Sequence, residues 1–230
     1  MSEYIVIGTI IAAFAVAAVL SYFFTPPVKN FAHKVGAIDV PKDARRMHKK
    51  PIPRLYLKNY LYRNFDQPAP NLVWITDITY VKVAESFCYI CVYIDLFSRM
   101  VLSYGISDTI DSTLTMKTFD GAFQKRGYPK GLMVHSDQGA QYTSHVFRSY
   151  MKKKKVRQSF STPGTPYDNS VCESFFHVLK NEAVYRYLYQ TPLELEAVVK
   201  EYIHFFNEER PHRKLDMKTP LQFETESENM

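Results

Sequence analysis

Three acidic residues are candidates for chemistry: Asp77, Asp137 and Glu173. Asp77 interrupts an apolar stretch of β-type residues, Asp137 ends another, and Glu173 follows the start of a predicted helix. Carboxylates that a fold brings together repel one another and resist ionisation unless a cation neutralises them. Oxygen ligands without accompanying cysteines or histidines favour Mg²⁺ or Mn²⁺. Because two such ions can activate an attacking oxygen and stabilise a leaving oxygen, the triad predicts a two-ion site for phosphodiester chemistry.

Alternating strands and helices are predicted to position these acids. Strands rich in Val, Ile, Tyr and Phe are predicted over 72–83, 87–95, 100–106, 132–135 and 156–159. Helices are predicted over 112–125 and 143–154, after a cap at Asp168 or Asn169, and from Pro192, with Ser112 and Thr143 as further caps. This order indicates an α/β fold of the ribonuclease-H type, a mixed five-stranded sheet flanked by helices. It places Asp77 on the central strand, Asp137 at a neighbouring strand end, and Glu173 on a helix above both.

Two further sets of residues are candidates for contacting DNA. Helical spacing places Asn169, His177 and Lys180 on the same face as Glu173, although an ordinary polar helix face explains them equally well. The second set can follow a phosphate backbone or be a solvated helix end: Lys152, Lys153, Lys154, Lys155 and Arg157.

Other polar residues near these motifs have simpler explanations. His135 precedes Asp137 by two residues, and a packed core histidine is favoured over a metal ligand. Asp95 competes for a metal role but ranks below the triad. A solvated helix end explains the last group at least as well as contact with the DNA backbone: Arg210, His212 and Arg213.

Composition excludes several classes of protein. The chain has 230 residues, 46% hydrophobic and 15% aromatic, which indicates an ordered domain with an appendage. Its three cysteines do not make a secreted disulfide framework. Cys88 and Cys91 stand three apart on a predicted strand, so they should face opposite sides as buried thiols. The net charge is +6, yet residues 64–230 carry 19 Lys and Arg against 20 Asp and Glu, so overall basicity does not indicate nucleic-acid binding.

The N-terminal region has a different character. Tyr4–Phe24 is a 21-residue stretch without charge, and as a helix it would extend about 30 Å, the thickness of a bilayer core. A signal peptide is less favoured because no basic segment precedes it, and a buried helix is the other alternative. Basic residues follow the stretch, which predicts an outside N-terminus and a cytoplasmic catalytic domain tethered to the membrane.

The segment Val35–Arg54 carries the first of two resemblances. Together with the apolar stretch, it resembles the first transmembrane helix and cytoplasmic loop of polyprenyl-phosphate N-acetylglucosamine-1-phosphate transferases, over residues 1–55. In that family Gly-Gly follows the Pro-Arg pair and opens further spans, whereas Leu55 follows here. The resemblance therefore implies a fragment without sugar-phosphate transferase activity. The predicted division of the chain continues with a linker at residues 56–70, a catalytic core at 71–224 and an acidic tail at 225–230.

The second resemblance covers residues 59–224 and rests on five motifs. They are Trp74-Ile-Thr-Asp-Ile-Thr-Tyr80, Tyr93-Ile-Asp-Leu-Phe-Ser-Arg99, His135-Ser-Asp-Gln-Gly-Ala-Gln-Tyr-Thr-Ser144, Pro166-Tyr-Asp-Asn-Ser-Val-Cys-Glu-Ser-Phe-Phe176 and Phe206-Asn-Glu-Glu-Arg-Pro-His212. Together they resemble the catalytic part of bacterial insertion-sequence transposases of the IS-three type, in the retroviral-integrase superfamily.

This resemblance implies a DDE-type transposase in which Asp77, Asp137 and Glu173 bind Mg²⁺ or Mn²⁺. Water would attack a DNA phosphodiester, and the freed 3′-hydroxyl would then attack a target strand. The implied partners are element ends and target DNA, a companion end-binding subunit, and further copies of the chain. Because the family's helix-turn-helix region is not visible, we expect non-autonomous transposition. The alternatives are a catalytically silent, membrane-anchored DNA-binding fusion and a remnant of the membrane transferase.

Overall fold

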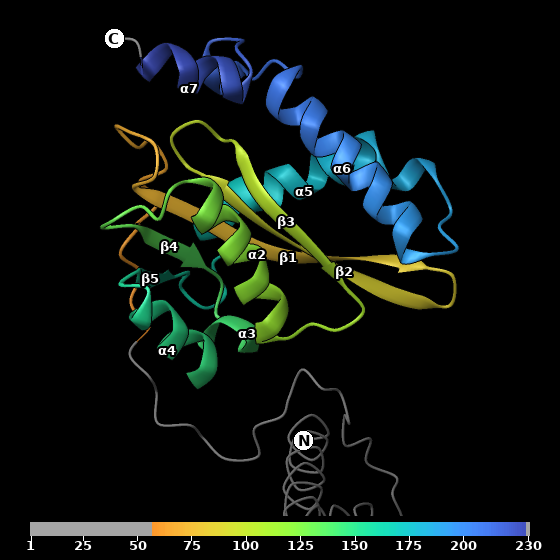
Figure 1. Ribbon diagram of the computed structural model, residues 1–230, viewed down its shortest axis with the longest axis horizontal. Helices are drawn as coiled ribbons and strands as arrows, with labels where there is room; N and C mark the ends of the chain where they lie inside the picture. The colour runs from red at the N-terminus through yellow and green to blue at the C-terminus, as the bar shows by residue number, and fades with distance from the viewer. Residues whose placement is uncertain (1–56, 229–230) are drawn as a thin grey trace, which may run out of the picture. The chain divides into compact units, whose positions relative to one another are not determined.

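The computed structural model describes residues 57–228. Five strands form one sheet in the order β3-β2-β1-β4-β5 (Figure 1). They are β1 (Val73–Val83), β2 (Ser86–Asp95), β3 (Val101–Ser107), β4 (Met133–Ser136) and β5 (Arg157–Phe160). β2 pairs antiparallel with both β1 and β3, whereas β4 runs parallel to both β1 and β5. The prediction of a mixed five-stranded sheet is confirmed.

Helices cover both faces of this sheet (Figure 1). One face packs against α5 (Ser170–Glu182) and α6 (Pro192–Glu208), and the other packs against α2 (Ser112–Lys125), α3 (Ala140–Thr143) and α4 (His145–Lys153). Strand alternation explains the two layers, because Ile75 and Val92 join the α5 side while Trp74 and Tyr93 join the α2 side.

The cysteines follow the same alternation. Cys88 lies in the core beneath α5, and Cys91 lies in the core beneath α2. Both are buried free thiols, as predicted.

Helix starts differ from the sequence predictions because polar side chains compete for the same backbone groups. Asp111, not Ser112, caps α2, since its carboxylate accepts hydrogen bonds from the N–H groups of residues 113 and 114. The helix predicted over 143–154 begins instead at His145, because Ser144, not Thr143, caps α4, and Thr143 is the last residue of the short helix α3. Asn169 stands at the N-cap position of α5, one of the two predicted, but its side chain makes no capping hydrogen bond, and it also ends a preceding 3₁₀ helix, Pro166–Asn169.

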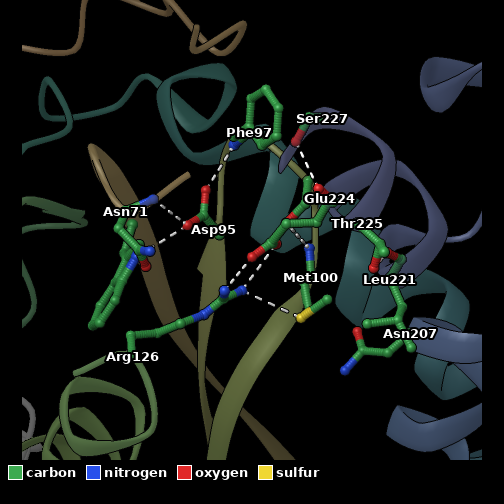
Figure 2. A network of polar contacts seen from close by, with 12 residues as sticks. Asn71, Asp95, Phe97, Met100, Arg126, Asn207, Leu221, Glu224, Thr225 and Ser227 are labelled. Atoms are coloured by element: carbon green, nitrogen blue, oxygen red, sulfur yellow. Dashed lines mark hydrogen bonds and ion pairs between the residues drawn. The ribbon is translucent and has the colours of Figure 1, made fainter. Parts of the chain in front are cut away.

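A further helix, α7 (Pro220–Glu228), follows a short 3₁₀ turn at Arg213–Leu215, and a second such turn, Val184–Arg186, follows α5. The predicted boundary between core and tail at residue 224 falls inside α7. Figure 2 shows the reason: the Glu224 carboxylate reaches the Arg126 guanidinium at the end of α2, and both side chains are largely buried.

The predicted membrane span Tyr4–Phe24 lies outside the described residues. Within residues 57–228, no helix combines the length and apolar character needed to cross a membrane.

Candidate active site

The sheet topology brings two of the acids to one place. β4 pairs with β1 only over Val73–Ile75, so Asp77 comes just beyond the paired stretch. Asp77 shares the strand face of Ile75, which is covered by α5. β4 ends at Ser136 and delivers Asp137 directly afterwards. Asp77, Asp137 and Glu173 line one cavity of about 540 Å³.

Both aspartates are held by neighbouring backbone groups. The Ile78 N–H donates to Asp77 Oδ1 at 2.8 Å, and the Gly139 N–H donates to Asp137 Oδ1 at 2.9 Å. These bonds fix the carboxylates without neutralising them. The loop after β4 thus holds Asp137 through the backbone of Gly139.

Without a cation, the surroundings of the two aspartates favour their protonated, neutral forms. Burial, together with the nearby charges of Asp137 and then Glu173, raises the pKa of Asp77 to about 7, against the opposing effects of the Ile78 N–H and Lys180. Burial likewise raises the pKa of Asp137. Such an acid pair in a cavity is typical of a functional site, because a bound cation would relieve both costs.

Glu173 lies at the rim of the cavity, where its side chain is exposed. Within residues 57–228, no three His, Cys, Asp or Glu side chains are close enough together to hold one ion. Asn169 also lines the cavity, and its buried Oδ1 has no hydrogen-bond partner. Two half-buried carboxylates, a third at the rim and an unpartnered amide oxygen line the same cavity, and oxygen groups of this kind are the ligands that Mg²⁺ and Mn²⁺ prefer.

The other candidates on the Glu173 face divide into two groups. The Lys180 Nζ lies 5.3 Å from the centre of the Tyr80 ring, on the same strand as Asp77. Its charge lowers the pKa of Asp77. Asn169 donates from Nδ2 to the Thr76 carbonyl at 3.4 Å. His177 does not line the cavity; it is exposed and lies within hydrogen-bond distance of Asn181.

The lysine run also divides. Lys154 Nζ pairs with Asp120 at 3.1 Å and lies over the ring of Tyr150, which gives it a structural role. A basic hollow of about 360 Å³ is lined by Lys152, Lys155 and Arg157, together with Arg148, Val156 and Gln158. Lys153 is exposed but does not line this hollow.

Three competing residues have structural roles. His135 is fully buried between the hydroxyls of Ser159 and Ser161, at 2.8 and 3.1 Å, and burial lowers its pKa to about 4. Asp95 accepts hydrogen bonds from the backbone N–H groups of residues 71 and 97 (Figure 2). Arg210 forms a two-contact ion pair with Glu182 on α5.

Sequence reasoning missed much of the cavity wall. The loop of residues 161–165 contributes five lining residues and leads into the 3₁₀ helix Pro166–Asn169. Pro163 and Gly164 mark a loop in the sequence, but no local pattern indicates that it faces the acids.

Comparisons with known proteins agree with this geometry. A family model described as Integrase core domain matches residues 67–166, and a second family model with the same description matches residues 154–220. The chain is 36% identical over 167 residues to the transposase for insertion sequence element IS904 of Lactococcus lactis, covering 72% of this chain and 66% of that protein. It is 34% identical to the putative transposase InsK for insertion sequence element IS150 of Escherichia coli, covering 74% of this chain and 60% of that protein.

Solved structures support the fold. The catalytic core domain of HTLV-2 integrase in complex with magnesium aligns with a TM-score of 0.55 at 23% identity, over 68% of this chain and 98% of that one. A simian T-cell lymphotropic virus intasome in complex with a PP2A regulatory subunit aligns with a TM-score of 0.60 at 22% identity, over 78% of this chain and 61% of that one. The ribonuclease-H-like fold is therefore confirmed, whereas the transferase resemblance at residues 1–55 lies outside the matched family region and stays a prediction.

The matched motifs, the sheet order and the acid-lined cavity agree: residues 67–220 form an integrase core domain of the kind found in insertion-sequence transposases, and the chain belongs to that family.

Proposed function

We propose that this chain catalyses metal-dependent DNA cleavage and strand transfer at the ends of an insertion sequence. The observation that carries the proposal is the half-buried Asp77–Asp137 pair, which shares one cavity with Glu173. The chain spans 60–66% of the length of the two curated relatives described above. The activity of a whole transposase, which their names state, is therefore part of the proposal for this chain.

The residues of the cavity have distinct tasks in this proposal. Asp77 and Asp137 would hold the cation, and Glu173 would complete the ligand set from the rim. Two divalent ions, when bound, would supply activation of the attacking oxygen and stabilisation of the leaving one. Lys180, whose charge lowers the pKa of Asp77, would place a positive charge beside a phosphate at the cut. No covalent enzyme intermediate is required, because the cavity needs only to orient the nucleophile and the phosphate.

The test is cleavage of a labelled duplex that carries the inverted repeat flanking the gene. We expect the full chain to cut this duplex in Mg²⁺ or Mn²⁺ and to stop when a chelator is added. Asp137→Asn and Glu173→Gln should remove cleavage while duplex binding persists. Equal cleavage by wild type and both variants would contradict the proposal. Binding without cleavage by the wild type would favour the alternative, a catalytically silent DNA-binding fusion.

The basic hollow supplies a second surface for DNA. Within residues 57–228, none of its four basic side chains forms an ion pair: Arg148, Lys152, Lys155 and Arg157. The hollow includes Arg157 at the start of β5, and the catalytic cavity includes Ser161 just after its end, about 13 Å away at 3.3 Å per residue. A duplex is long enough to contact both, so we propose that the hollow binds backbone phosphates beside the cut.

This surface predicts a change in salt dependence. The double variant Lys152→Ala and Lys155→Ala should weaken duplex binding and make it less sensitive to salt. The slope of log affinity against log salt should fall by about 0.9 for each phosphate that the variant no longer neutralises. Fluorescence anisotropy from low to moderate salt measures this slope. Lys154→Ala is the matched control, since its Asp120 partner already occupies it, and an equal slope change there would contradict the assignment.

The remaining predictions belong to the same proposal. One solved structure of similar fold is named an intasome, and we propose that this chain likewise acts in a DNA complex that contains several copies and a companion end-binding subunit. We also propose that residues 1–55 derive from a membrane transferase and tether the catalytic domain to the inner membrane face. Such a fusion would cleave DNA yet depend on the companion subunit for transposition.

A further inference from the structure

A buried carboxylate outside the triad holds the segment that forms one wall of the catalytic cavity. Asp168 lies in the 3₁₀ helix that joins the loop of residues 161–165 to α5, and it is 3% exposed. Its Oδ2 accepts a hydrogen bond from the Thr162 N–H at 2.9 Å. The two ends of this wall segment are therefore tied together through one side chain.

The other donors to Asp168 come from far away in the sequence. Asn59 Nδ2 donates to Oδ2 at 2.9 Å, and Arg63 Nε donates to Oδ1 at 2.6 Å. Burial alone would raise the pKa of Asp168, but the hydrogen bonds from Arg63 and Thr162 hold it below its usual value. We call Asn59, Arg63 and Asp168 the latch.

The segment that presents the latch is itself fixed to the core. Tyr62 and Arg63 have φ angles of 47° and 61°, a left-handed conformation that non-glycine residues adopt only when their surroundings enforce it. Leu61 is 2% exposed within the core under α5. Ser159 Oγ accepts hydrogen bonds from the N–H groups of Tyr60 and Leu61, at 2.9 and 3.2 Å.

The latch lies next to residues that line the cavity with the acids. Asn169, the next residue after Asp168, lines the cavity, and Glu173 comes five residues after Asp168 on the first turn of α5. A movement at Asp168 would therefore move both the cavity wall and the third carboxylate.

We propose that Asp168 is a positioning residue, held by Asn59 and Arg63, that sets the start of α5 so that Glu173 faces the Asp77–Asp137 pair. The inference rests on the proposed function. It also extends the working catalytic unit upstream of residue 67, where the match to the integrase core family begins.

The test is Mn²⁺ binding to the full chain, measured by electron spin resonance of free Mn²⁺ without DNA. In Asp168→Asn an amide nitrogen replaces one carboxylate oxygen, so it faces an N–H donor and loses the charge that Arg63 contacts. We expect Mn²⁺ affinity to fall about tenfold, in the range seen for residues that orient metal ligands. Arg63→Ala should weaken binding similarly, and Arg63→Lys should restore part of it.

Glu224→Gln is the matched control, because it breaks a buried ion pair at α7 without touching the cavity. It should lower stability and leave Mn²⁺ affinity unchanged. Wild-type affinity in Asp168→Asn, or an equal affinity loss in Glu224→Gln, would overturn the latch.

If the wild type binds no Mn²⁺, the proposed function fails and the latch is judged by hydrogen exchange. Faster exchange at residues 161–169 in Asp168→Asn, but not in Glu224→Gln, supports the latch as a device that orders the wall. Unchanged exchange there overturns it.

Discussion

Replacing Asp77 with asparagine is expected to abolish DNA cleavage and to make the metal-free protein more stable. Cleavage should fall at least about a thousandfold, because a residue that acts as part of a catalytic unit takes most of the activity with it when removed. Stability should rise because asparagine keeps the acceptor for the Ile78 N–H and removes a buried charge that Asp137 repels. Opposite signs for activity and stability distinguish a catalytic carboxylate from a structural one.

The size and pH dependence of this stability gain follow from the raised pKa. In the folded state the pKa of Asp77 rises from its ordinary 3.8 to about 7, so the folded protein holds a proton that the unfolded chain releases. The penalty is absent below about pH 4, develops between pH 4 and 7, and is constant above. Taken at full value, this rise in pKa corresponds to a destabilisation of about 4 kcal/mol. Since the side chain is partly exposed, we expect water to reduce this to about 2 kcal/mol.

Urea unfolding with a chelator present, at pH 5 and pH 8, measures the effect. The gain of the asparagine variant should be larger at pH 8. Asp95→Asn is the control, because the Asp95 carboxylate accepts backbone hydrogen bonds at both oxygens and an amide nitrogen would face a donor (Figure 2). It should lower stability. A loss of stability in Asp77→Asn at both pH values would contradict this account of the site.

Replacing Glu224 with alanine is expected to lower the free energy of unfolding by about 3–5 kcal/mol, the usual result of breaking a buried ion pair from one side. The side chains of Arg126 and Glu224 are 14% and 6% exposed, and Arg126 Nε already lacks a partner. Without Glu224, the guanidinium would keep only the Met100 sulfur at 3.3 Å among the contacts drawn in Figure 2. Urea unfolding measures the loss, and hydrogen exchange should show α7 detaching.

The same helix supplies a matched control. Glu226 also pairs with a basic residue, Lys218, but those side chains are 54% and 39% exposed. Glu226→Ala should therefore change the unfolding free energy by less than about 1 kcal/mol. Equal losses in the two variants would show that α7 itself, rather than its buried ion pair, contributes the stability.

The sheet and the placement of the acids could be predicted because their signals are local. Apolar runs of β-type residues mark β1, β2 and β3, and alternation assigns Cys88 and Cys91 to opposite faces. Asp77 and Asp137 stand out because each breaks or ends such a run. Parallel pairing of β4 with β1 then makes the two acids neighbours.

The latch, the cavity wall and α7 could not be predicted because their partners are distant or their patterns weak. Asn59 and Asp168 are 109 positions apart, and nothing in either neighbourhood indicates the other. α7 has acids at 224, 226 and 228, which resemble a solvated tail. Only the position of Arg126 in the fold shows that Glu224 turns inward. Side-chain competition, as at Asp111 and Ser144, likewise decides helix starts to within a residue.

The cost of the Asp77–Asp137 pair also bears on how this gene would age. In a lineage that no longer benefits from DNA cleavage, selection for a folded chain alone would favour replacing either aspartate, since each replacement relieves repulsion. Core residues such as Trp74 would be kept for longer, because their loss opens cavities. Loss of the acid pair would thus be an early marker of genetic decay, and a chain that retains both aspartates is expected to stand close in time to an ancestor that cut DNA.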